Sequence, residues 1–126
     1  MDWLDIPELN GIDLTESYVL GWNESAETVT LQLELVLCPD HPDYCCPPET
    51  EYACFRHGSL TFIGVSSTNG LPNQSSVRAY VDANGESDYG HIESFSVNSG
   101  VFSLGLECGL VTIKADLISM CMAKHN

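Results

Sequence analysis

The chain has 126 residues, of which 44% are hydrophobic, and 18 acidic residues against 4 basic ones give it a formal net charge of −14. This length suits one domain, and the apolar share is that of an ordinary globular protein. The charge disfavours direct binding to nucleic acid or to an anionic membrane surface, because both depend on lysine and arginine meeting phosphates. A basic protein would instead be attracted.

The acidity is concentrated in the first half of the chain. Residues 1–63 hold twelve acidic residues and one basic residue, whereas residues 64–126 hold six and three. No apolar run reaches the roughly 20 residues of a membrane helix, and the first residues lack the basic and apolar regions of a signal peptide. We therefore expect a cytoplasmic protein with reduced cysteines.

The N-terminal half begins with a lead-in and a strong strand signal. Pro7 and Asn10-Gly11 interrupt the first 14 residues, so we expect at most one short helical turn there. From Glu27 to Leu37, apolar and polar residues alternate at a period of two, which predicts a half-buried strand. Residues 17–22 should pair with this strand through a turn at residues 23–26.

A loop rich in proline and cysteine follows the strand. Four prolines lie between positions 38 and 48, and proline has no amide hydrogen to donate to a sheet. The sequence therefore predicts a loop insertion over residues 38–54, within a single β-rich domain that spans residues 1–126.

The remaining residues carry further strand and turn signals. Residues 55–66 predict a strand with a bulge at its end, and residues 66–76 predict a loop. Asn84-Gly85 indicates a hairpin that joins residues 77–81 to residues 90–97. Residues 102–106 and 111–117 predict the two closing strands. About seven strands with short turns indicate an all-β fold, either an antiparallel sandwich or a partly open barrel.

The cysteine loop offers one candidate metal site. Thiolate and imidazole are the ligands that zinc prefers, and four of them close a structural site. The candidate ligands are Cys38, His41, Cys45 and Cys54. In the alternative interpretation, Cys38 and Cys54 are small buried residues at strand ends, and no cofactor is bound.

Two further candidates lie in the second half of the chain. Residues 82–88 have oxygen-bearing side chains at the spacing of a calcium loop, but the glycine stands at the fourth position instead of the sixth. A hairpin turn explains the same residues. Asp88, His91 and Glu93 could serve acid–base chemistry in an uncatalogued hydrolase, although the sequence has no motif that positions a nucleophile.

The same loop predicts a binding surface. Aromatic side chains surrounded by carboxylates are typical of a surface that binds a basic protein. The candidate binding residues are Asp40, Asp43, Tyr44, Glu49, Glu51 and Tyr52. A solvated loop without a partner is the alternative.

Two segments carry a resemblance to known proteins. Ser17-x-Val19-x-x-Trp22 leads into the alternating strand, and Gly85-Glu86-x-Asp88-Tyr89-Gly90-x-Ile92-x-x-Phe95 precedes the closing strands. This arrangement resembles small uncharacterised bacterial β-proteins, some of them immunity proteins to polymorphic toxins. Such proteins bind a cognate toxin and block it, so the resemblance implies a non-enzymatic binding role. Our leading interpretation is an acidic inhibitor of a basic toxin. The alternatives are a zinc-stabilised interaction domain and a hydrolase.

Overall fold

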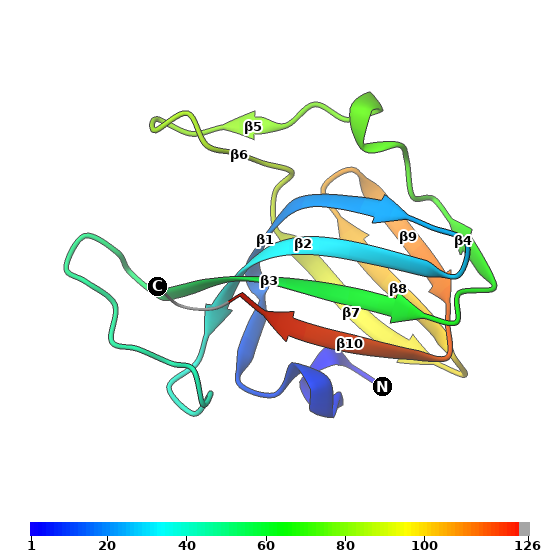
Figure 1. Ribbon diagram of the computed structural model, residues 1–126, viewed down its shortest axis with the longest axis horizontal. Coiled ribbons are helices and arrows are strands. Elements are labelled where there is room, and N and C mark those ends of the chain that lie inside the picture. The colour runs from blue at the N-terminus through cyan, green and yellow to red at the C-terminus, as the bar shows by residue number, and fades with distance from the viewer. Residues whose placement is uncertain (124–126) are drawn as a thin grey trace.

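Alternating apolar and polar residues build two four-stranded antiparallel sheets that bury one face each. The computed structural model describes residues 1–123 and is shown in Figure 1. The first sheet has the order β1-β2-β3-β10. It consists of β1 (Ile12–Glu24), β2 (Thr28–Leu37), β3 (Cys54–Ile63) and β10 (Leu117–Met122).

The second sheet has the order β4-β9-β8-β7 and faces the first. It consists of β4 (Ser67–Asn69), β9 (Gly109–Lys114), β8 (Val101–Leu106) and β7 (Ile92–Asn98). A separate two-stranded ribbon consists of β5 (Tyr80–Val81) and β6 (Ser87–Asp88). The helical elements described are single 3-10 turns: η1 (Trp3–Asp5), η2 (Pro7–Leu9) and η3 (Gln74–Ser76).

Three phenylalanines join the sheets at the centre of the core. Phe62 of the first sheet packs against both Phe95 and Phe102 of the second, with ring centroids 6.1 and 5.3 Å away. Offset and edge-on aromatic contacts of this kind add to the free energy gained from burial. Each ring is at most 6% exposed. The two sheets therefore share one hydrophobic core.

The N-terminal lead-in closes one open side of the sandwich. The backbone of Met1 exchanges hydrogen bonds of 2.7 and 2.8 Å with Val97 at the edge of β7. From there η1 lies against β7 and η2 lies against β10. Ile6 and Leu9 are buried in the core. The lead-in thus bridges the edges of two strands that belong to different sheets.

The all-β prediction is confirmed, and the predicted pairing of residues 17–22 with the alternating strand is also correct. β1 pairs with β2 through the predicted turn, and β2 keeps the predicted alternation, with its odd-numbered residues buried. Trp22 belongs to the core, at 7% exposure. The lead-in contains two 3-10 turns where we expected at most one short helical turn.

Several predicted details are wrong. The described residues form ten strands instead of about seven. The hairpin at Asn84-Gly85 exists, but it joins β5 to β6, while β7 pairs with β8. The last predicted strand, residues 111–117, is interrupted: β9 ends at Lys114, and Leu117 begins β10 in the other sheet. β3 pairs without interruption up to Ile63, so no bulge is present there. The loop at residues 66–76 contains β4 and η3.

Two segments project beyond the first sheet. Residues 38–53 form the predicted loop, and the β5–β6 ribbon extends from the loop after η3. In Figure 1 the ribbon lies above β1 at the upper left, and the loop extends to the left from the ends of β2 and β3.

The lead-in predicts a matched pair of stability effects. Replacing the buried Leu9 (2% exposed) with alanine leaves a cavity and should lower the free energy of unfolding by about 2–4 kcal/mol. The same change at Leu4, which is 66% exposed, should alter it by less than about 0.5 kcal/mol. Urea denaturation followed by circular dichroism measures both values. Equal effects would contradict a lead-in that seals the core.

Candidate functional site

A row of four polar side chains crosses the outer face of the first sheet. Tyr18 of β1 lies opposite Glu34 of β2, which in turn lies opposite His57 of β3. On the other side of Tyr18, His91 forms an isolated bridge with it just before β7 begins. We call His91, Tyr18, Glu34 and His57 the polar row.

An irregularity in β1 brings Tyr18 into this row. The β1–β2 register shifts between Asp13 and Tyr18. The buried Ser17 stabilises the shift, because its hydroxyl donates to the Asp13 carbonyl at 2.8 Å and accepts from the Val36 amide at 3.1 Å. A bulge of this kind re-aims the side chains that follow it. Here it sets Tyr18 opposite Glu34 on the outer face.

The members of the row contact one another. The rings of Tyr18 and His91 lie with their centroids 4.2 Å apart. His57 Nε2 is 3.5 Å from Glu34 Oε2, and the two side chains are 65% and 29% exposed. The row therefore contains a half-buried carboxylate between a phenol and an exposed imidazole.

The two projecting segments flank the polar row. From the loop, Tyr52 packs edge-on against Phe55, with centroids 5.3 Å apart, and its side chain is the largest cause of the raised pKa of Tyr18. From the ribbon, Glu86 and Asp88 act on Glu34. The surface thus combines the rings of Tyr18 and Tyr52 with the carboxylates of Glu34, Glu86 and Asp88.

Burial and negative neighbours shift two pKa values in this surface. The Tyr52 side chain, followed by burial, raises the pKa of Tyr18 to about 12, and Asp88 and Glu16 add to the shift. Burial is the largest cause of the raised pKa of Glu34, with smaller upward contributions from Glu86 and Asp88, while His57 lowers it. Both shifts favour the protonated form, so the carboxyl of Glu34 and the phenol of Tyr18 resist ionisation.

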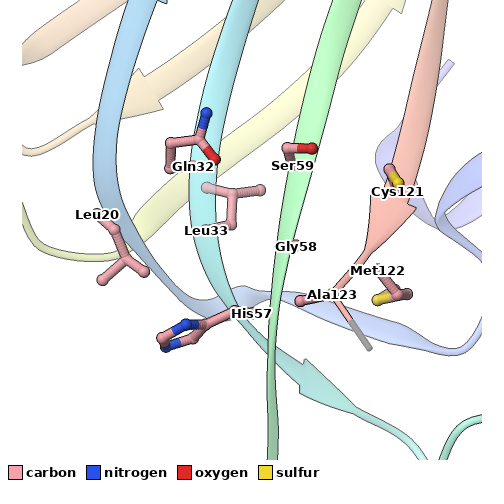
Figure 2. A pocket seen from close by; sticks show the side chains of 9 residues that line it. All are labelled: Leu20, Gln32, Leu33, His57, Gly58, Ser59, Cys121, Met122 and Ala123. Carbon is pink, nitrogen blue, oxygen red and sulfur yellow. The ribbon is translucent and has the colours of Figure 1, made fainter. Parts of the chain in front are cut away.

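A shallow hollow continues the surface toward β10. It has a volume of about 220 Å³ and is lined in part by Leu20, Gln32, Ser59 and Cys121. Figure 2 shows Leu20 and His57 at one end, with Gln32 and Ser59 further along β2 and β3. Gln32, Ser59 and Cys121 lie opposite one another across three strands. His57 also lines the hollow, so it connects the hollow to the polar row.

The structure divides the predicted binding residues. Tyr52 is 74% exposed and joins the surface around the polar row. Tyr44 is half-buried and packs against the core. Asp43 is exposed, and its carbonyl accepts a hydrogen bond from Arg56. Glu49 and Glu51 are exposed in the loop, and Asp40 lines a separate pocket beside the N-terminal lead-in.

The predicted zinc ligands fall into two pairs. Cys38 and His41 share a turn next to Gly11, and the Cys45 amide donates to the sulfur of Cys54 at 3.4 Å. Within residues 1–123, no group of three or more histidine, cysteine, aspartate or glutamate side chains is arranged to hold a metal ion. The zinc site stays a prediction from ligand type alone.

The other candidates serve the turns in which they lie. Asp82 Oδ1 accepts from the amides of Asn84 and Glu86 at 2.9 and 3.0 Å, as expected for a hairpin turn. Asp88 Oδ1 accepts from the Gly90 amide at 2.7 Å. Glu93 is exposed on β7, in a different sheet from Tyr18, Glu34 and His57. These contacts do not favour the calcium or hydrolase alternatives.

Arg56 holds the loop against the end of β10. Its guanidinium donates to the carbonyl of Asp43 at 3.3 Å and to that of Ala123 at 3.4 Å. These two bonds join the loop to the last described residue of the chain. Because Tyr52 lies in the same loop, Arg56 limits the positions that the loop can take beside the polar row.

Sequence patterns missed Tyr18, Glu34 and His57 as members of one site. The alternation in β2 does place Glu34 on the outer face. The neighbours of Glu34, however, depend on the shifted register of β1 and on the pairing with β3. Neither follows from the spacing of residues along the chain.

Comparison with protein families, curated proteins and solved structures found no match. The function is therefore inferred from this chain's own residues. Over residues 1–123, no helix combines the length and apolar character needed to cross a membrane.

The raised pKa of Glu34 predicts a pH-dependent effect of Glu34→Gln. A carboxyl whose pKa is raised on folding contributes stability at low pH and loses it as the pH rises above its ordinary value of 4.5. The glutamine variant should therefore become more stable than the wild type as the pH rises from about 5 to about 8. Thermal unfolding across this range measures the difference. The control is Glu49→Gln, which removes one charge from the exposed loop; an equal gain there would contradict the local cause.

The Arg56 contacts predict a local loss of order in Arg56→Lys. Lysine keeps the charge but lacks the planar fork that reaches two carbonyls at once. We expect faster amide exchange in residues 39–46 and a free energy of unfolding lower by about 1–2 kcal/mol. Hydrogen exchange followed by mass spectrometry locates the change. Arg78→Lys, at an exposed position, should leave exchange in this loop unaltered.

Proposed function

We propose that this domain is a non-enzymatic binding protein that captures a basic protein surface through the polar row and its two flanking segments. The observation that carries the proposal is the half-buried carboxylate of Glu34. It lies opposite Tyr18, and the carboxylates of Glu86 and Asp88 contribute to its raised pKa. In the form that the resemblance to immunity proteins implies, the partner is a toxin, and binding blocks it.

The chemistry of the surface fits an arginine or lysine side chain. A carboxylate binds the charged group, and aromatic rings favour a cation over their faces. Glu34 supplies the carboxylate, and Tyr18 and Tyr52 supply the rings. An incoming cation would also relieve the repulsion that Glu86 and Asp88 exert on Glu34. These features favour a specific anchor point over general attraction to negative charge.

The surroundings of the row suit contact with a folded protein. Thr30 and Thr61 lie side by side on the same face, with their hydroxyls 3.4 Å apart, and Ser59 and Gln32 continue it toward the hollow. These uncharged polar groups can exchange hydrogen bonds with a partner. The formal charge of −14 then steers a basic partner during its approach.

Affinity purification from the source cells tests the proposal. We expect wild-type protein to retain a basic protein, and Tyr18→Ala or Glu34→Gln to weaken its binding at least about tenfold, which corresponds to about 1.4 kcal/mol. Glu27→Gln, which removes an exposed charge beyond the end of β1, should weaken binding far less. Calorimetric titration of the purified partner measures each Kd, and circular dichroism confirms that the variants fold.

The salt dependence of the same binding distinguishes the direct contact at Glu34 from the long-range attraction by net charge. Raising the ionic strength should slow association and leave dissociation nearly unchanged, because screening acts on charges that are far apart. A partner without basic character, or binding that tolerates both Tyr18→Ala and Glu34→Gln, would count against the proposed surface.

A further inference from the structure

Three cysteines gather around one hollow at the base of the loop. Cys45, Cys46 and Cys54 line a hollow of about 310 Å³, together with Phe55. All six cysteines of the chain lie in the described residues and carry free thiols. Cys54 is buried at the edge of the core, and the proposed binding surface uses none of these three thiols.

The sulfur of Cys54 lies against the backbone of Cys45. The amide nitrogen of Cys45 is 3.4 Å from Cys54 Sγ. A disulfide joins residues whose Cα atoms are about 4.4–6.8 Å apart. A sulfur so close to the backbone of Cys45 lies within reach of that residue's own side chain after a rotation about its Cα–Cβ bond.

The two thiols differ in exposure and in the kind of segment that carries them. Cys54 is 8% exposed, and it begins β3 opposite Leu37, so the sheet fixes it. Cys45 is exposed and belongs to the loop. An accessible thiol next to a sheltered one is the arrangement in which the first is oxidised and the second resolves it.

We infer that Cys45 and Cys54 form a disulfide when the protein meets a hydroperoxide. The Cys45 thiol reacts with one hydrogen peroxide molecule to give a sulfenic acid and one water. The Cys54 thiol then attacks the Cys45 sulfur, the S–S bond forms as the S–O bond breaks, and a second water leaves. Two thiols lose two electrons and two protons in total, and the peroxide is reduced to water.

The bond would tie the end of the loop to the first sheet. The ring that it closes contains Tyr52, together with Glu49 and Glu51. Tyr52 packs on Phe55 beside the polar row. Oxidation would therefore restrict the position of Tyr52, and in this respect the inference rests on the proposed function. The formation of the disulfide itself does not depend on any partner.

Peptide mapping of the peroxide-treated protein tests the inference. A protease that cuts after glutamate separates Cys54 from the other loop cysteines, because Glu49 and Glu51 lie between them. We expect residues 35–49 and 52–86 to stay linked, with the mass of two hydrogens missing, until a reductant separates them. Folded protein should form the link at least about tenfold faster than protein in urea, because the fold holds the thiols together.

Two exposed-site variants assign the link without disturbing the core. Cys45→Ser should abolish it, and Cys46→Ser should leave it in place, since Cys46 is exposed next to Cys45 in the chain. A link that survives Cys45→Ser, a link lost in Cys46→Ser, or equal rates in folded and unfolded protein would overturn the inference. Binding of a basic partner plays no part in this readout, so failure here and failure of the proposed function remain distinguishable.

Discussion

The hydroxyl of Ser17 determines where the outer face of the first sheet places its functional groups. An irregular strand leaves backbone donors and acceptors without partners, and such groups are costly when they are buried. Ser17 is fully buried and bonds one carbonyl of β1 and one amide of β2. With the irregularity satisfied, β1 resumes pairing in a shifted register, and Tyr18 lies opposite Glu34. The polar row depends on this internal hydrogen-bonded bridge more than on any residue at the surface.

The net charge of −14 does not describe how the acidic residues around Glu34 are arranged. Burial raises the pKa of the half-buried Glu34, Glu86 and Asp88 of the ribbon raise it further, and His57 is its one described ion-pair partner. The burial of a carboxylate and the approach of like charges on folding both weaken the folded state. In the proposed complex, a positively charged side chain of the partner would offset the repulsion between Glu34 and the two ribbon carboxylates. Under the proposed function, stability given up at Glu34 is recovered when the complex forms.

Local patterns predicted the strands well where each residue's role depends on its nearest neighbours. The alternation in β2 is an example, since burial on one face is enough to produce it. The break between β9 and β10 falls at Ala115 and Asp116, without glycine or proline, so an alternating run concealed a change of sheet. The site was predicted only in part. Tyr52 was found from its acidic neighbours, whereas Tyr18, Glu34 and His57 come together through cross-strand register, which a single sequence does not encode locally.

The β5–β6 ribbon contributes no side chain from residues 80–88 to the hydrophobic core. It turns at Gly85, whose positive φ of 82° and open surroundings belong to the turn alone. The core anchors it from outside its own length, through partly buried Val77 and Tyr89. The sequence of this segment can therefore change, or a peptide can be inserted at its tip, without altering the two sheets. Under the proposed function, the same freedom makes it a natural place for related proteins to diverge in partner choice.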